Sequence, residues 1–269
     1  MDSATYITII SKDKLMKYWP LILPLLATTT PLFANENRGD ARERVEPMGY
    51  LYGFGLGVSQ EIYKGYDYRV IPLPILGYRG ENFRVLGPFV SYDALQLGDV
   101  EVELKISPRF QGFDETDSEI FTNMDKRKFS MDAGVGFTYE RNNWKLGFSS
   151  MFDILSNSKG FETSANISRV FRQGPIFIEP SVRVSYLDEN HVDYYYGVKP
   201  YEVNELTYHY QGSPAVNTSL GLSVGTPILL GGFTQVAIDY TLYDSAITNS
   251  PLVEDSHNLN MRLLFSKFF

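Results

Sequence analysis

The sequence predicts an all-β protein: an antiparallel transmembrane β-barrel of about 12 strands, with 10 as the alternative, behind a cleaved signal peptide. Three observations predict this fold. Segments of roughly ten to twelve residues alternate apolar and polar side chains, longer than a soluble strand of ~5 to 6 residues but matched to the ~9 to 11 that cross a bilayer. The connections between them are by turns short and long. The chain is rich in Tyr (19) and Phe (18) and contains no Cys, so it has no disulfide or thiolate chemistry.

The first 34 residues have the order of a secretory signal peptide. Three lysines precede a short, proline-broken apolar run, and small residues lead to Ala34, after which Asn35 begins a polar stretch. The apolar run is shorter than the ~20 residues of a spanning helix. We predict cleavage between Ala34 and Asn35, with Met16 as an alternative start of the chain. Residues 35–269 show no break in composition and are expected to form one barrel domain.

The alternating segments give an odd number of candidate strands, whereas a bacterial barrel with both ends in the periplasm needs an even number. Counted back from residue 269, the fault lies before residue 129, where a strand is missed, split or does not span. The candidates cover 50–59, 69–78, 83–92, 100–111, 130–140, 144–154, 161–170, 176–186, 216–224, 236–242 and 259–269.

The final segment, 259–269, is expected to close the barrel. Its apolar face ends on Phe269, and polar residues such as Asn260 and Arg262 alternate with that face. Because an open strand edge in lipid leaves backbone groups unsatisfied, the last strand should pair with the first. The same strand is the segment that we expect the barrel-assembly machinery to recognise.

The polar faces of the candidate strands carry both signs of charge, which favours a packed polar lumen with ion pairs across it. Glu179 and Asp239 oppose Arg183 and Arg262 in this set. Short connections are typical of the periplasmic side and long polar loops of the outer side. The short ones are 141–143, 173–175 and 226–232, and the long ones are 113–128, 188–212 and 244–257.

Two motifs give a resemblance to a known family. Residues 65–74 read Gly-Tyr-Asp-Tyr-Arg-Val-Ile-Pro-Leu-Pro, and residues 193–198 read Asp-Tyr-Tyr-Tyr-Gly-Val. With the terminal aromatic residue, they resemble the family of outer-membrane proteins that is named for the MltA-interacting protein (MipA) and OmpV. The positions that carry the resemblance are Gly65, Asp67, Tyr68, Arg69, Pro72, Pro74, Tyr194, Tyr195, Tyr196, Gly197 and Phe269.

This resemblance implies an outer-membrane β-barrel. For the name-giving member it implies a scaffold that brings a lytic transglycosylase to a bifunctional penicillin-binding protein during murein growth. The tyrosines at 194–196 lie in a long loop, and exposed Tyr is typical of recognition surfaces and of interfacial girdles alike. For these tyrosines we favour a girdle or loop packing over a ligand site.

Pro72 and Pro74 remove two ladder donors on the same face of one strand. That strand therefore pairs fully on one side only, or it bulges. One hypothesis is a local opening near the first hairpin. The alternative is a strand at the edge of the membrane whose prolines simply contact lipid.

No catalytic, cofactor or metal site is predicted. The three histidines, His191, His209 and His257, fall in long loops, and no strand places a Ser and a His at alternating positions. The acidic residues in 114–119 lack the spacing and glycine of a calcium loop. The signal segment carries three basic and two acidic residues, so its removal takes the net charge from −8 to −9 and argues against nucleic-acid binding.

The sequence thus favours a non-enzymatic scaffold of the Gram-negative outer membrane, exported through the periplasm and linked to murein synthesis. Its expected partners are outer-membrane lipid and lipopolysaccharide, the barrel-assembly machinery, and a periplasmic murein hydrolase or synthase. A narrow, porin-like diffusion channel for small solutes is the alternative, because many charges face inward. A third hypothesis is an adhesin or surface receptor, with recognition carried by the long loops.

Overall fold

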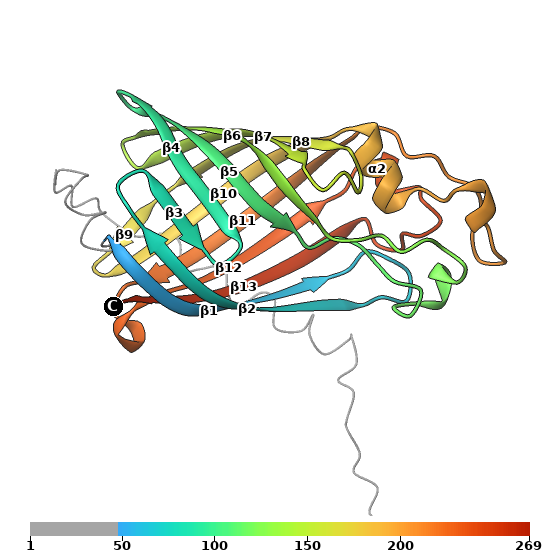
Figure 1. The fold of residues 1–269 in the computed structure, drawn as a ribbon, viewed down its shortest axis with the longest axis horizontal. Helices are drawn as coiled ribbons and strands as arrows, with labels where there is room; N and C mark the ends of the chain where they lie inside the picture. Colours follow the sequence, from blue (N-terminus) through green and yellow to red (C-terminus); the bar gives the residue numbers. More distant parts are fainter. Residues whose placement is uncertain (1–47) are drawn as a thin grey trace, which may run out of the picture. The chain divides into compact units, whose positions relative to one another are not determined.

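The structure, a computed structural model, describes residues 48–269. The expected signal peptide, its cleavage between Ala34 and Asn35, and the alternative start at Met16 lie outside the described residues. Within 48–269, no helix is long and apolar enough to cross a membrane. The described chain forms one antiparallel sheet that closes into a barrel of 12 strands, as the even-number argument predicts (Figure 1).

Thirteen segments make up the sheet, because one of the 12 strands is interrupted. β8 and β9 are its two parts, and both pair with β10. The segments are β1 (Gly49–Gln60), β2 (Tyr68–Arg79), β3 (Phe83–Leu86), β4 (Phe89–Leu97), β5 (Val100–Arg109), β6 (Ser130–Arg141), β7 (Trp144–Asp153), β8 (Phe161–Arg169), β9 (Phe171–Gln173), β10 (Ile176–Leu187), β11 (Ala215–Thr226), β12 (Phe233–Leu242) and β13 (His257–Phe268). The helical segments are η4 (Glu119–Phe121), α2 (Glu189–Tyr196), η5 (Pro200–Glu202), η6 (Leu229–Gly231) and α3 (Ser245–Thr248).

The last strand closes the barrel against the first, as expected. β13 pairs antiparallel with β1 from Leu51↔Phe268 to Ser59↔Asn260. The ladder continues one residue further, where the Phe269 backbone N–H donates to the Tyr50 carbonyl at 3.0 Å. This register satisfies the backbone groups that a free terminal edge would leave unpaired in lipid.

The two faces of the wall follow the alternation of the sequence. The outward side chains of β1 and β13 are apolar and exposed; Phe54 is 46% and Met261 45% accessible. Between them, Gly55 and Arg262 face inward. Apolar side chains therefore cover the lipid side and polar ones line the lumen.

The candidate strand 83–92 is wrong as a single strand. It folds as a hairpin, β3 and β4, around Gly87 and Pro88, and β4 continues to Leu97. Gly87 takes φ +59°, a left-handed conformation that glycine adopts without strain, and proline cannot continue the β3 ladder. This hairpin supplies the strand that the sequence count lacks before residue 129.

The β3–β4 hairpin is short and leaves part of the wall unpaired. β3 pairs with β2 at three positions, from Gly77↔Leu86 to Arg79↔Arg84, and β4 pairs with β5 no further than Val90↔Ile106. We call residues 70–75 of β2 and 107–109 of β5 the unpaired edges. Among the described strands, none pairs with these edges on the side of the hairpin.

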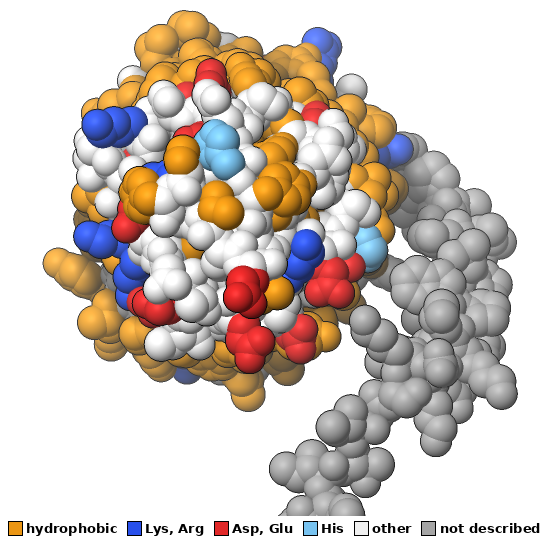
Figure 2. Space-filling view, turned by 90° about the vertical axis from the view of Figure 1, so that its right-hand side faces the viewer, with side chains coloured by type: hydrophobic (Ala, Val, Ile, Leu, Met, Phe, Trp, Pro, Cys, Tyr) orange, Lys and Arg blue, Asp and Glu red, His pale blue; other side chains and the backbone are white. Residues whose placement is uncertain are grey.

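The apolar core of the molecule lies in the long loops, outside the barrel wall. Loops from 61–67, 110–129, 188–214 and 243–256 pack together at one end and form what we call the cap. Figure 2 looks onto this end, where polar, charged and scattered apolar side chains form the surface. Phe113 and Phe121 stack with ring centroids 3.9 Å apart. The buried cluster comprises Ile62, Tyr63, Phe113, Ile120, Phe121, Met124, Leu187, Val192, Tyr195, Tyr196, Val198, Ala215, Ile247, Leu252 and Val253.

Gly53 and Gly57 both face inward on β1, but the space available for a side chain differs between them. A Cβ on Gly53 would lie 1.9 Å from the Phe265 carbonyl oxygen, whereas one on Gly57 would lie 3.8 Å from the Ile71 Cβ. We expect Gly53→Ala to weaken the β1–β13 closure by about 1–3 kcal/mol, and Gly57→Ala to have little effect. Urea unfolding in lipid vesicles measures both, and equal losses of stability would contradict the prediction.

Candidate functional site: the lumen and its outer cap

The strongest charge cluster of the lumen surrounds Arg109, near the outer end of β5. Its Nε donates to the Asp132 carboxylate at 2.8 Å, and its terminal nitrogen donates to Glu162 at 2.9 Å. These partners come from β6 and β8, so one guanidinium connects three strands. The planar guanidinium is always charged and has several N–H donors, so it can bind two carboxylates at once.

Further ion pairs join the wall strands. The Lys145 Nζ lies 3.7 Å from Glu140 and 3.6 Å from Glu179, and Ser168 donates to Glu179 at 2.7 Å. Arg262 of β13 donates to Asp239 of β12 at 2.6 Å. Three of the four lumen charges named from the sequence, all except Arg183, thus lie in contact with a polar partner.

Arg183 differs from the other lumen cations. It lies on β10 with its side chain exposed to the lumen, and within residues 48–269 its guanidinium has no hydrogen bond or ion pair. It lines a polar pocket of about 240 Å³. The pocket is lined by Ser107, Pro108, Arg109, Asp132, Ser149, Met151, Glu162, Ser164 and Arg183. A guanidinium without a carboxylate partner, beside several hydroxyls, is suited to hold a carboxylate or phosphate oxygen.

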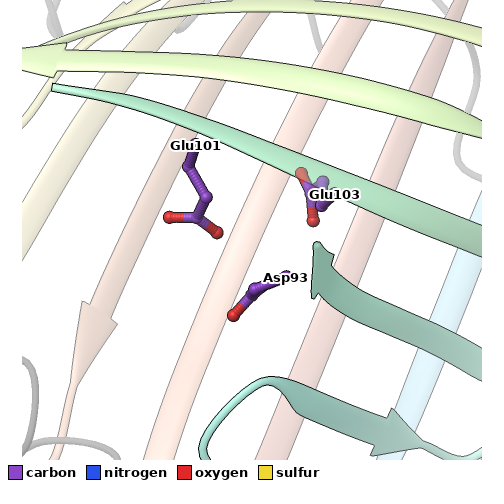
Figure 3. A group of neighbouring side chains, drawn as sticks. All are labelled: Asp93, Glu101 and Glu103. Carbon is purple, nitrogen blue, oxygen red and sulfur yellow. The ribbon is translucent and has the colours of Figure 1, made fainter. Parts of the chain in front are cut away.

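Asp93, Glu101 and Glu103 form an acidic group on the inner wall (Figure 3). Their carboxylate oxygens lie within 4.8 Å of one another, and oxygen ligands of this kind suit a divalent cation. Lys105 already lies 2.5 Å from Glu103, however, and Arg84 lies 3.7 Å from Asp93. We therefore assign the group to the charge network of the lumen. The group could not be predicted from the candidate strands, because Asp93 falls just beyond the strand expected at 83–92.

The cap contains a buried ion pair. Arg127 donates to both carboxylate oxygens of Glu202, at 2.8 and 2.7 Å, and their side chains are 2% and 0% exposed. Burial acts to raise the pKa of Glu202, but the hydrogen bonds from Arg127 outweigh it, and the net pKa lies below the usual 4.5. Arg127 also donates to the Tyr194 carbonyl at 2.6 Å. One guanidinium therefore fastens the 110–129 loop to the 188–214 loop.

His191 is buried in α2, beneath the cap. Asp188 caps this helix by accepting from the His191 backbone N–H at 3.1 Å. Among the described residues, the buried His191 Nε2 has no hydrogen-bond partner. Burial, followed by the positive charge of Arg109, lowers the His191 pKa well below its usual 6.5. The imidazole is therefore neutral at pH 7.

The first motif fastens the start of β2 to the end of β5. Arg69 donates from Nε to Glu61 at 2.8 Å, and its terminal nitrogens donate to the carbonyls of Phe110 and Gly112. Gly65 has φ +68° and lies against Ser118 of another cap loop. Of the other motif positions, the Asp67 carbonyl accepts from the Glu61 N–H, and Tyr68, Pro72 and Pro74 are exposed on the outer face.

The second motif packs the cap. Tyr195 and Tyr196 are buried, and the Tyr194 ring meets the Tyr195 ring edge-on with centroids 4.8 Å apart. Gly197 ends α2, and its N–H donates to the Asp193 carbonyl at 2.9 Å. These tyrosines therefore lie in the packing between loops, one of the two placements favoured from the sequence. Phe269, in contrast, is 88% exposed, with its ring 5.1 Å from that of Tyr52.

The contacts of the histidines are with backbone and aromatic rings. His209 makes a 2.7 Å hydrogen bond to the Val198 carbonyl, and the His257 ring rests on Tyr240 at 5.3 Å. In the part of the chain that the structure describes, none of the three histidines is hydrogen-bonded to a serine or threonine hydroxyl. The geometry therefore assembles no hydroxyl–imidazole pair of the kind that acyl transfer uses.

Breaking the Arg127–Glu202 pair should loosen the cap. Removing one partner leaves an uncompensated buried charge, so we expect Arg127→Met to cost about 3–5 kcal/mol of cap stability. The double variant Arg127→Met/Glu202→Leu should recover much of that loss. Limited proteolysis of the long loops in vesicles reports both variants. Equal protease resistance of the wild type and Arg127→Met would contradict the prediction.

Cap stability should also depend on pH through His191. Because its pKa is lower in the folded cap than in the unfolded chain, its contribution is present above pH 6.5 and is lost as the pH falls below that value. Glu202 adds a loss at lower pH, below its usual 4.5. Hydrogen exchange of residues 188–214, corrected for intrinsic rates, should show faster opening at pH 5 than at pH 7. His191→Gln should reduce that difference, and an unchanged difference would exclude His191 as its source.

The chain is similar to known outer membrane proteins. The chain is 27% identical over 210 residues to the outer membrane protein YiaT of Escherichia coli (strain K12), covering 75% of this chain and 83% of that protein. It is 27% identical over 212 residues to the MltA-interacting protein of the same strain, covering 77% and 85%. Among solved structures it is similar to the Ralstonia pickettii toluene transporter TbuX, at 9% identity and a TM-score of 0.42, covering 83% of this chain and 90% of that one.

The family model described as "MltA-interacting protein MipA" matches residues 52–269, which is nearly all of the described chain. Relatives named outer membrane proteins and a closed barrel place the protein in the outer membrane. The chain is therefore a member of the MltA-interacting protein (MipA) family of outer-membrane β-barrel proteins.

Proposed function

We propose that this chain is a non-enzymatic scaffold that holds a murein hydrolase or synthase at the periplasmic face of the outer membrane. The name of one relative, the MltA-interacting protein, supports the murein link. The observation that carries the proposal is the cap, in which four loops fill the outer end with their own apolar core. A barrel closed in this way leaves the end with short turns as the face that a periplasmic protein can reach.

That end presents an apolar turn between β11 and β12. Ile228, Leu229 and Leu230 are 67%, 51% and 71% exposed, and Leu230 adopts φ +56°. Three consecutive exposed apolar side chains are unusual for a solvated turn and are typical of an interaction site. We assign the contact with the murein enzyme to this turn.

The assignment predicts a loss of affinity on making the turn polar. We expect the triple variant Ile228→Ser/Leu229→Ser/Leu230→Ser to bind a purified lytic transglycosylase or penicillin-binding protein about tenfold more weakly, because it removes apolar contact area. Glu81→Ser, in the short turn between β2 and β3, is the matched control and should bind as the wild type does. Surface plasmon resonance on barrels in nanodiscs measures all three.

Unchanged affinity of the triple variant would move the contact to another turn. A wild-type barrel that binds no murein enzyme from either class would overturn the scaffold proposal itself.

A channel is the second candidate, and the unpartnered Arg183 beside the polar pocket favours it. The two functions differ in planar bilayers. As a capped scaffold, residues 35–269 should be electrically silent. Steady anion-selective steps that lose their selectivity in Arg183→Gln would establish a pore and displace the scaffold proposal.

A further inference from the structure

We propose that the barrel wall opens laterally between β2 and β5, and that a single-chain anionic amphiphile, a long-chain monocarboxylate, enters the lumen there from the bilayer. The opening is bounded by the unpaired edges, by the β3–β4 turn and by the side chain of Arg69. This inference is independent of the scaffold function, because it concerns the wall and the lumen and not the short-turn end.

The first step is the geometry of the wall. At the level of the β3–β4 hairpin, two strands separate β2 from β5, which corresponds to three strand spacings or about 14 Å. Beyond Gly87, the two strands continue toward the cap with no strand between them. They meet again where Arg69 donates to the Phe110 and Gly112 carbonyls. Between these two levels, no backbone ladder seals the wall.

The second step is that prolines remove three of the four backbone donors that would face the opening, and Val70 keeps the fourth. The Gly87 N–H donates to the Leu76 carbonyl, so the even-numbered residues of β2 direct their backbone groups toward the hairpin. Pro72 and Pro74 are even-numbered and carry no N–H. On β5, the Glu140 N–H donates to the Asp99 carbonyl, so the odd-numbered residues face β6 and Pro108 faces the open side.

All three prolines therefore stand where an N–H would face the opening. An unsatisfied donor in hydrocarbon costs several kcal/mol, and a strand edge with its donors present invites pairing with another strand. Removing the donors lets the edges stay apart. The prolines thus fit a permanent opening better than an incidental contact with lipid.

The third step is the lining just inside the opening. Ile71, Leu73 and Ile75 of β2 point inward, and Ile75 is 2% exposed. Gly55 and Gly57 of β1 stand beside them, and a Cβ on Gly55 would lie 3.4 Å from the Leu73 Cβ. This stripe of apolar side chains, beside two glycines, differs from the rest of the lumen, where charged side chains form ion pairs. It suits a hydrocarbon chain, which gains about 0.8 kcal/mol per buried CH₂.

The fourth step supplies the head group. The polar pocket reaches the open edge of β5, because Ser107 and Pro108 belong to its lining. In the same lining, Arg183 is the cation that has no partner among the described residues. A carboxylate held by Arg183, with its chain directed along the apolar stripe, would use both features. An uncharged amphiphile would leave the guanidinium unpaired.

Photo-crosslinking tests the proposal. The barrel, residues 35–269, is reconstituted in vesicles of phosphatidylethanolamine and phosphatidylglycerol with a 16-carbon fatty acid that carries a diazirine near the end of its chain. We expect label on the inward residues Ile71 and Leu73, mapped by mass spectrometry. Unlabelled hexadecanoate should displace it at about tenfold lower concentration than hexadecanol, which lacks the carboxylate. Label confined to outward residues such as Val70 and Leu76 would mean contact with surrounding lipid only and would overturn the proposal.

Variants separate the chain site from the head-group site. Leu73→Trp fills the apolar stripe and should reduce inward labelling severalfold, whereas Leu220→Trp, on the lipid face of fully paired β11, should not. Arg183→Gln should remove the advantage of hexadecanoate over hexadecanol. Folding of each variant is checked by its heat-modifiable migration. Equal displacement by the two competitors in the wild type, or labelling that Leu73→Trp leaves unchanged in a folded barrel, would overturn the proposal.

Discussion

The need to satisfy every backbone amide and carbonyl within hydrocarbon governs this protein. The β1–β13 ladder exists because neither terminal strand can present a free edge to lipid, and the side chains follow from it, apolar outside and polar within. The same need explains how the described wall tolerates the unpaired edges of β2 and β5. There the chain removes donors with Pro72, Pro74 and Pro108 and covers two carbonyls with Arg69.

A barrel wall with apolar side chains on its lipid face cannot also supply a conventional core. In this protein the main apolar cluster lies in the loops, where aromatic rings from separate loops pack together. Arg127 and Glu202 form a buried ion pair in the same region. The lumen takes the complementary role. Its charges pair between strands, most densely around Arg109, and Arg183 stands out because nothing in the described chain pairs with it.

Much of this architecture could be predicted, because strand alternation is a local property of the sequence. Most strands and the long and short connections follow from patterns within a few residues, whereas the 12-strand count and the closing pair follow from the rule that a barrel leaves no open edge. The hairpin around Gly87 was missed because 83–92 has the length and the apolar content of one strand, and two short strands joined by a tight turn can have the same composition as one long strand. A Gly-Pro pair is the signal that could have separated them.

The cap and the candidate sites could not be predicted from local sequence patterns. Helix α2 depends on the Asp188 cap and on burial against other loops, and Arg127 and Glu202 are 75 residues apart in the chain. Nothing in the sequence pairs them before the fold brings their loops together. The inward set of charges was predictable from alternation, but which of them lacks a partner depends on the angles and lengths of individual side chains. The prolines of the first motif were identified from the sequence. Only the register of β5 shows that Pro108 also faces the unpaired side of the wall.

The shared apolar core of the cap limits how the sequences of the long loops can vary. In many outer-membrane barrels, separate loops offer antibodies and phages separate targets, and each can vary by itself. Here Tyr63, Phe121, Tyr196 and Leu252 come from four different loops and meet in one cluster. A substitution at any of these positions alters the packing of the other three loops. Exposed loop positions such as Tyr201 and Leu206 can therefore vary without disturbing this cluster, whereas exchange of one whole loop would disturb the packing of the other three.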